Sequence, residues 1–186
     1  MLEIYVDGSA INNENPNKPT LGGVGICMIS PKGDSVVANG EVQGFHYTVA
    51  NHKLVDSDES IREHGQPMLE LDLGKTTNNT TELAAIYVAL SYFEGGEFAP
   101  VKIKIYGDSQ YAGNLVFGNW KPKENKELVA KVKQMASKVP NDVTWEYVKA
   151  HADNQYNNYA DYLARSGAYK TPEEEVLSFN EWLLTA

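Results

Sequence analysis

The alternation of strand-like and helix-like segments limits the fold of this chain more than any other feature of its sequence. Apolar residues at every second position, or in short runs, predict five strands over residues 2–6, 22–30, 35–44, 101–106 and 143–148. Apolar residues at helical spacing predict four helices over residues 79–93, 109–117, 125–138 and 157–169. The order βββαβααβα therefore predicts an α/β fold, in which helices pack on a mixed five-stranded sheet.

Two segments fall outside this regular order. Residues 45–75 have alternating apolar residues near both ends and an acidic stretch between them. We interpret this segment as an insertion that leaves the sheet, partly as a hairpin. In residues 171–186, Thr171 can cap a helix that begins at Pro172, and an apolar stripe follows. The stripe consists of Val176, Phe179, Trp182 and Leu183.

These segments define the expected domain limits. Residues 1–170 are expected to form one domain that includes the insertion, and residues 171–186 are expected to form a C-terminal amphipathic helix. An apolar stripe of this kind usually docks on its own domain. The alternative is docking on a partner or a dimer contact between two copies of the chain.

Composition and cysteine content limit the location of the protein. The chain has 186 residues, of which 42% are hydrophobic, but no apolar run approaches the roughly 18 residues that a membrane span needs. The N-terminal segment contains acids and no basic run, so we expect no secretory signal. The single Cys27 excludes an intramolecular disulfide and is typical of a reducing compartment. We therefore expect a cytoplasmic protein without membrane contact.

The net charge of −9 disfavours a general nucleic-acid binder, because phosphate neutralisation supplies most of that affinity. The charge is uneven, however. Residues 121–138 contain six lysines and two glutamates, a net charge of +4. Residues 53–74 contain two basic and six acidic residues, a net charge of −4. Local fields of opposite sign are therefore expected on the two segments.

Four acidic residues stand where an acid does not help folding. Asp7 ends an apolar strand, Glu82 lies in the first turn of an apolar helix, and Asp108 follows another strand. Asp161 lies among small residues on the inward face of the last predicted helix of the domain. Taken singly, Glu82 could complement the helix dipole and Asp108 could cap the next helix. Clustered together, carboxylates need cations to offset their repulsion, and Mg²⁺ prefers such oxygen ligands.

Four blocks of sequence occur in a fixed order along the chain. They read Asp7-Gly8-Ser9, Thr76-Thr77-Asn78-Asn79 followed by Glu82, Asp108-Ser109-Gln110, and Trp145 to His151 followed ten residues later by Asp161. Together these blocks resemble type 1 ribonuclease H, a family that cuts the RNA strand of RNA–DNA hybrids. The resemblance covers roughly residues 1–44 and 75–169, and it implies a ribonuclease H-like catalytic domain.

The resemblance implies roles for the acidic residues. Asp7, Glu82, Asp108 and Asp161 match the four carboxylates with which the family holds two Mg²⁺ ions, for which Mn²⁺ is a substitute. By position, Asp7 bridges both ions, Asp161 serves the ion near the attacking water, and the other two serve the ion near the leaving group. The implied reaction is endonucleolytic hydrolysis by a two-metal-ion mechanism, which leaves 5′-phosphate and 3′-hydroxyl ends.

Further residues match the family's histidine and its substrate contacts. His151 matches a mobile histidine implicated in proton traffic and product release, and a surface-loop histidine is the alternative. Thr77 matches a pocket for a DNA-strand phosphate, and a turn residue before a helix is the alternative. Short amides match residues that read ribose hydroxyls and base edges. The residues expected to contact the hybrid are Gly8, Ser9, Thr77, Asn78, Asn79, Gln110 and Asn157.

The chain departs from the family pattern in three places. The loop after Asp7 is longer than usual, and the insertion at 45–75 has no counterpart that we recognise. Its histidines are interpreted as solvated loop residues and not as a metal site: His46, His52 and His64. The basic protrusion that some members carry is missing, so we infer that the lysine-rich face of 121–138 contacts phosphates through Lys121 and Lys123. A solvated helix face is the alternative.

The leading hypothesis is therefore a metal-dependent endonuclease that cuts RNA in RNA–DNA hybrids. One alternative is a hybrid-binding module with little turnover, which the acidic net charge and the missing protrusion suggest. The complete set of four acids argues against it. Another alternative is a related nuclease that acts on structured DNA. The amides at Asn78, Asn79 and Gln110 argue against it, because they fit ribose recognition.

Overall fold

A computed structural model of the chain describes residues 1–12, 17–30, 41–55, 69–96 and 102–185. Its strands are β1 (Leu2–Ile11), β2 (Leu21–Ile29), β3 (Val42–Ala50), β4 (Lys53–Val55), β5 (Glu70–Asp72), β6 (Ile103–Gly107) and β7 (Val143–Tyr147). They form one sheet in the order β5-β4-β3-β2-β1-β6-β7. β6 lies parallel to both β1 and β7, and all other neighbours are antiparallel. The mixed sheet is therefore as predicted, except that it has seven strands instead of five.

The two additional strands come from the segment that was predicted to leave the sheet. β3 ends at Ala50, and β4 and β5 continue the sheet at its edge, where Leu54 pairs with Leu71 and both side chains are buried. The prediction of an excursion was therefore wrong for this part, because its alternating leucines cover the core. The third strand extends further than predicted. It spans Val42–Ala50 and so includes the end of the predicted strand 35–44, of which residues 35–40 lie outside the described residues.

The four predicted helices are confirmed within three residues at their ends. They are α1 (Asn78–Ser91), α2 (Gln110–Val116), α3 (Lys126–Ser137) and α4 (Gln155–Ala168), and a 3-10 turn, η2 (Glu94–Gly96), follows α1. α1 is capped by Thr77 in a capping box with Thr80. α4 begins earlier than predicted because Asn154 caps it, and its side chain accepts from the N–H groups of Tyr156 and Asn157.

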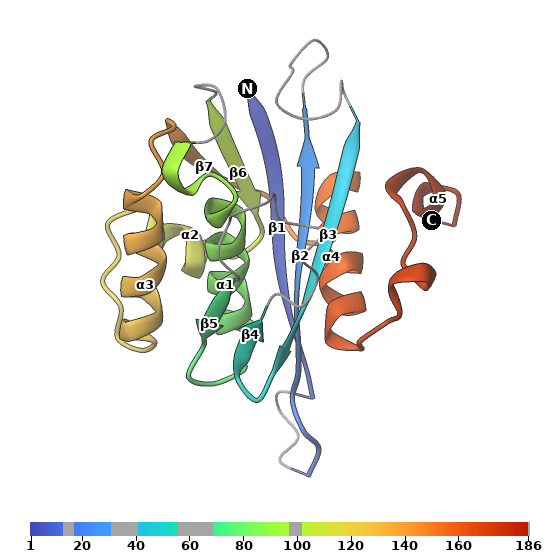
Figure 1. Cartoon of the computed structure of the whole chain (residues 1–186), viewed down its shortest axis with the longest axis horizontal. Helices are drawn as coiled ribbons and strands as arrows, with labels where there is room; N and C mark the ends of the chain where they lie inside the picture. The colour runs from blue at the N-terminus through green and yellow to red at the C-terminus, as the bar shows by residue number, and fades with distance from the viewer. Residues whose placement is uncertain (13–16, 31–40, 56–68, 97–101, 186) are drawn as a thin grey trace.

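Helices cover both faces of the sheet (Figure 1). α1, α2 and α3 lie on one side, which we call the α1 face, and α4 lies on the other, the α4 face. Side chains alternate between the faces along β1, so Leu2, Ile4 and Val6 join the core under α1, whereas Tyr5 joins the core under α4. By the same alternation, Asp7 falls on the α4 face.

The C-terminal segment is not the continuous amphipathic helix that was predicted. A 3-10 turn, η3 (Glu173–Glu175), is followed by extended chain and the short helix α5 (Phe179–Leu183), which begins at a capping box of Ser178 and Glu181. The hydroxyl groups of Tyr159 and Tyr162 bond the backbone O and N–H of Leu177 at 2.8 and 2.9 Å. These bonds hold the chain extended where a helix was expected.

The apolar stripe of this segment packs on its own domain. Phe179 is 8% exposed, and Trp182 contacts the ring of Tyr159 at 5.3 Å between centroids. Val176 and Leu183 pack against the same cluster. The predicted intramolecular docking is therefore confirmed. The described residues give no support to the alternative, a dimer or partner contact through this segment.

None of the helices that the structure describes is both long enough and apolar enough to cross a membrane.

Candidate active site

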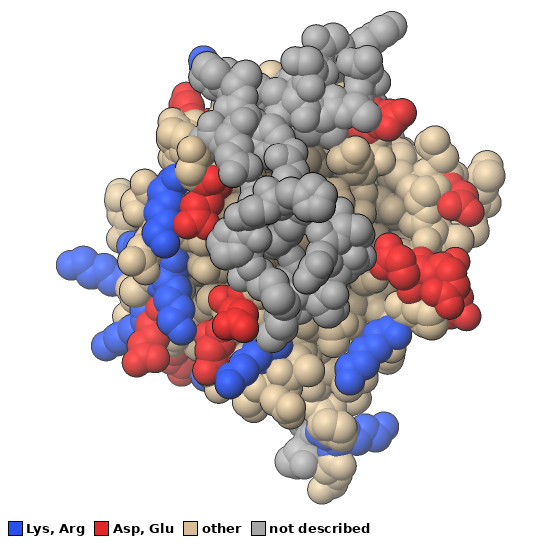
Figure 2. Space-filling model, in the orientation of Figure 1, with Lys and Arg blue, Asp and Glu red and all other residues tan. Residues whose placement is uncertain are grey.

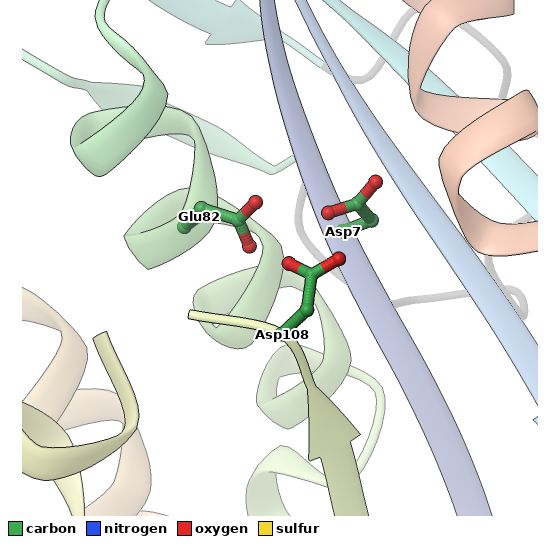
Figure 3. A group of neighbouring side chains, drawn as sticks. All are labelled: Asp7, Glu82 and Asp108. Carbon is green, nitrogen blue, oxygen red and sulfur yellow. The ribbon is translucent and has the colours of Figure 1, made fainter. Parts of the chain in front are cut away.

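Three of the four predicted carboxylates meet at one point of the molecule. Asp7 lies in β1, Glu82 in the first half of α1, and Asp108 directly after β6, and their side chains point toward one another (Figure 3). One carboxylate oxygen of each lies within 4.8 Å of the others. Asp108 is free for this role because Ser109, not Asp108, caps α2 by accepting from the N–H of Ala112 at 3.0 Å.

Glu82 reaches this point because α1 lies unusually close to β1. A Cβ atom at Gly8 would stand 2.4 Å from the backbone nitrogen of Glu82 and 2.3 Å from the carbonyl carbon of Thr81. Any side chain at Gly8 would therefore push α1 away from the strand. Gly8 thus has a packing reason in this structure: it sets the distance between the acid on the helix and the acid on the strand.

Burial makes these negative charges costly. Asp7 is 3% exposed, and burial together with the charge of Glu82 raises the pKa of Asp7 well above its usual range. Burial raises the pKa of Glu82 to about 8, and the charges of Asp108 and Asp161 add to that rise. Burial also raises the pKa of Asp108. Oxygen ligands that repel one another in this way fit a hard divalent cation, which would offset their charge.

Asp161 stands beside the three-carboxylate cluster and does not join it. Its charge raises the pKa of each of the other three acids, so it lies near them. Its Oδ2, however, lies 3.3 Å from Nε of Arg165 on the next turn of α4. Of the four predicted carboxylates, three therefore converge, and the fourth is partly exposed and paired with Arg165.

Close packing of α4 on β2 brings Asp161 and Asn157 to the three-carboxylate cluster. A Cβ at Gly25 would lie 2.1 Å from the carbonyl oxygen of Ala160, and one at Gly23 would lie 2.0 Å from that of Ala164. The helix backbone therefore rests directly on the strand. The sequence contained a signal for this contact, since glycines alternate along β2 and alanines recur along α4, but the prediction did not use it.

Asn157 extends the cluster from the first turn of α4. It is 2% exposed, and its Nδ2 donates to Oδ2 of Asp108 at 3.4 Å. Its Oδ1 is buried without a hydrogen-bond partner in the described part of the chain. His151 lies in the preceding loop at a φ of 56° and is exposed. The charge of a protonated His151 lowers the pKa of Asp108, so the two groups interact electrostatically.

Comparison with known proteins decides the family. The family model described as RNase H matches residues 1–169. The chain belongs to the ribonuclease H family. Ribonuclease H from Ruegeria sp. (strain TM1040) is 31% identical over 89% of this chain and 90% of that enzyme. Ribonuclease H from Prosthecochloris aestuarii is 38% identical, over 48% of this chain and 67% of that enzyme. The predicted family and the predicted enzyme class, a ribonuclease H, are confirmed.

Solved ribonuclease H structures share the fold. The structure of LC11-RNase H1 in complex with an RNA/DNA hybrid covers 91% of this chain, and this chain matches 98% of it, with a TM-score of 0.61 and 22% identity. This likeness confirms the ribonuclease H-like architecture of the chain. The carboxylate cluster also agrees with the metal dependence of the ribonuclease H family.

The residues predicted to contact substrate lie on the elements that surround the cluster. Gly8 and Ser9 follow Asp7 in β1, Thr77 to Asn79 open α1, and Gln110 is exposed at the start of α2. Asn78 Oδ1 accepts from the N–H of Ala10 at 3.3 Å, which turns its NH₂ group away from β1. The hydroxyl of Thr77 caps α1, as the alternative of a turn residue before a helix requires, and its contact with a DNA-strand phosphate stays a prediction.

The predicted basic surface lies at a distance from the carboxylates along the chain. Lys121 and Lys123 are exposed in the segment between α2 and α3, and basic side chains gather over α3 (Figure 2). A groove of about 570 Å³ is lined there by residues that include Lys75, Lys123, Asn125 and Lys131. The prediction did not include Lys75 or Asn125. The sequence did contain a signal for Lys75, because this basic residue directly precedes Thr76 and Thr77.

Proposed function

We propose that this ribonuclease H is an endonuclease that hydrolyses the RNA strand of RNA–DNA hybrids, and leaves 5′-phosphate and 3′-hydroxyl ends. The observation that carries this proposal is the approach of Asp7, Glu82 and Asp108 to within 4.8 Å of one another. Three acids from distant parts of the chain meet there, with Asp7 buried and the other two partly buried. This arrangement costs free energy, and a divalent cation would offset that cost.

Within this proposal, Asp7, Glu82 and Asp108 would hold the metal, and Asp161 would complete a second ion site from the rim. The cation is Mg²⁺, with Mn²⁺ as a substitute and two ions for each site. When bound, these ions neutralise charge on the phosphodiester and make water a stronger nucleophile at neutral pH. Arg165 pairs with Asp161 and would have to share that carboxylate with the second ion.

Two further residues of the chain would act on the reacting groups. Asn157 Nδ2 holds Oδ2 of Asp108, which fixes the orientation of that carboxylate. His151 is exposed and interacts electrostatically with Asp108, and it would take part in proton transfer and product release. Both residues belong to the loop and first turn that lead into α4.

The proposed substrate surface combines residues that recognise the groove of the hybrid with residues that contact its phosphates. Asn78, Asn79 and Gln110 would read ribose hydroxyls and base edges, with Gly8, Ser9 and Thr77 around them. Lys121 and Lys123 would contact phosphates further along the duplex. We propose residues 1–170 as the catalytic domain and residues 171–186 as a segment that stabilises it. A cytoplasmic location is proposed from the single Cys27.

Cleavage of a labelled hybrid, with Mg²⁺ and with EDTA, tests this function. Wild-type protein is expected to cut the RNA strand in Mg²⁺ alone, and Asp108→Asn is expected to lower the rate by at least about 1,000-fold. Glu94→Gln is the matched control, because it removes a partly exposed acid in η2, beyond the end of α1, that pairs with Lys138.

Duplex DNA and duplex RNA of the same sequence complete the experiment. Cleavage of the hybrid alone supports the proposal, because only the hybrid pairs a ribose strand with a deoxyribose strand. Equal cleavage of duplex DNA, or full activity of Asp108→Asn, would contradict it. Binding of the hybrid without cleavage, in Mg²⁺ or in Mn²⁺, would favour the alternative of a hybrid-binding module with little turnover.

A further inference from the structure

The turn between β3 and β4 places a histidine in a backbone conformation that favours glycine. Asn51 and His52 have φ values of 52° and 63°, and Ala50 pairs with Lys53 across them. This is the two-residue loop of a type I′ hairpin, in which Asn-Gly is the favoured pair. A side chain at positive φ costs free energy, so contacts made by His52 must offset that cost.

One such contact fixes the imidazole ring. His52 Nδ1 lies 2.9 Å from Oγ1 of Thr76, which is 6% exposed, and the His52 carbonyl oxygen accepts from the N–H of Leu73 at 2.8 Å. The turn is thereby tied to the loop that leads into α1. His52 itself is exposed, and in the described parts of the chain Nε2 has no hydrogen-bond partner.

The contact with Thr76 bears on what the exposed ring nitrogen can offer. When the ring is neutral and the Thr76 hydroxyl donates to Nδ1, the proton of the ring is on Nε2. In that tautomer Nε2 is a hydrogen-bond donor held in place.

The position of this donor relates it to the proposed substrate surface. Thr76 directly precedes Thr77 and Asn78, which open α1 and stand among the proposed hybrid contacts. The positive end of the α1 dipole lies at the same place. The other described charged residues on the adjoining strands and loop are Lys53, Glu70, Asp72 and Lys75.

The described charges beside His52 balance one another, with two lysines against two acids. Asp72 lies opposite Lys53, and its Oδ1 accepts from the N–H of Gly74 at 2.8 Å. Lys75 pairs with Glu124 at 3.7 Å, and its side chain is 53% exposed. A hydrogen-bond donor on an exposed side chain that no local excess of acids opposes suits a phosphate of a nucleic-acid backbone.

We propose that His52 is a further substrate-binding residue, whose Nε2 donates a hydrogen bond to a phosphate of the DNA strand that passes Thr77. The inference rests on the proposed function, because it requires a hybrid over the start of α1. It also assigns a role to the segment that departs from the family pattern. The β3–β4 turn would add a phosphate contact to a protein that is acidic overall.

Hybrid binding by two matched variants tests the proposal, in an Asp108→Asn background that does not cleave. His52→Asn keeps a short amide that can reach Thr76 and tolerates positive φ, but it has no atom at the place of Nε2. His52→Gly removes both contacts and relieves the backbone. Both variants are expected to bind the hybrid about three- to fivefold more weakly at pH 6, with an unchanged or higher melting temperature.

Melting temperatures of the same variants separate binding from folding. A deficit that accompanies a lower melting temperature of His52→Asn would instead assign His52 a purely structural role and overturn the proposal.

Neutral methylphosphonate groups, placed at one DNA-strand position at a time, locate the contact. One position is expected at which neutralisation weakens binding to the histidine protein but leaves binding to His52→Asn nearly unchanged. If neutralisation of the phosphate and the His52→Asn change weakened binding independently at every DNA position, the inference would be overturned. The proposed function would stand in that case, since the cleavage by wild type and its loss in Asp108→Asn are measured separately.

Discussion

The two faces of the sheet are built in opposite ways. The α1 face is filled with large aliphatic side chains, including Ile4, Ile26 and Ile105, each fully buried. On the α4 face, Gly23 and Gly25 let the helix backbone rest on the strand, and aromatic rings such as Tyr5 and Tyr159 fill the remaining space. Aliphatic burial supplies stability, whereas close backbone contact sets a distance. On the α1 face the exception is Gly8, where the same kind of close contact sets the distance of Glu82 from β1.

The largest expected effect on stability comes from the α1 face. Ile86→Ala removes a fully buried side chain from α1, and we expect it to lower the free energy of unfolding by about 2–5 kcal/mol because it leaves a cavity. Cleavage by the protein that remains folded at low temperature should change little. Urea unfolding and a hybrid cleavage assay at the same temperature measure the two quantities. A large loss of cleavage without a loss of stability would break the comparison.

The largest effect on activity expected from a change in packing comes from the α4 face. Gly25→Ala adds one methyl group where the carbonyl oxygen of Ala160 is 2.1 Å away, so α4 must shift and carry Asp161 with it. A misplacement of this kind is expected to lower the cleavage rate by about 100-fold. The neighbouring Ile26→Val is the control, since it loses one methylene on the opposite face. Equal rates for the two variants would show that the close contact does not position the acid.

A smaller effect concerns Glu82, which lies in α1 and reaches the carboxylate cluster with its side chain. Because burial raises the pKa of Glu82 to about 8, the folded protein favours its protonated form. The stability that this gives is present below the unfolded pKa near 4.5 and is lost as the pH rises toward 8. Without metal, Glu82→Gln should therefore be more stable than wild type at pH 8 by roughly 1–3 kcal/mol, and similar to it at pH 4.5.

Urea unfolding in EDTA across this pH range measures that difference, and Glu124→Gln serves as the exposed control. Added Mg²⁺ should reduce the advantage of Glu82→Gln at pH 8, because the cation would stabilise the wild-type carboxylates. A difference between the two proteins that does not vary with pH would contradict the assignment.

The smallest expected effect concerns Lys121 and Lys123, which lie between α2 and α3. If Lys121 and Lys123 each contact one phosphate, replacing either with Ala should lower the slope of log K against log salt by about 0.9. Affinity should fall by only a fewfold, because the side chains are exposed. Hybrid binding at several salt concentrations measures the slope. An unchanged slope would leave the two lysines as part of a solvated surface.

The sequence by itself determined the regular elements and the identity of the candidate ligands. Alternating and helical periodicity depend on which face of one segment is buried, and this information is local. The strand around Ile105 and the four main helices were therefore predicted within two residues. The strand around Ile4 begins as predicted but runs on to Ile11 instead of ending at residue 6. Asp7, Glu82 and Asp108 were recognisable because an acid at the end of an apolar segment has no folding role that repays its burial.

Only the tertiary structure decided how distant segments meet. Leucines at 69, 71 and 73 alternate in the same way whether they form an excursion or an edge strand, and pairing with β4 settled that. Whether Asp161 converges with the other acids depends on its pairing with Arg165 and on the seat of α4 on Gly25. The tie between His52 and Thr76 depends likewise on the strand register. Such contacts depend on distances between elements, which no periodicity within a single segment contains.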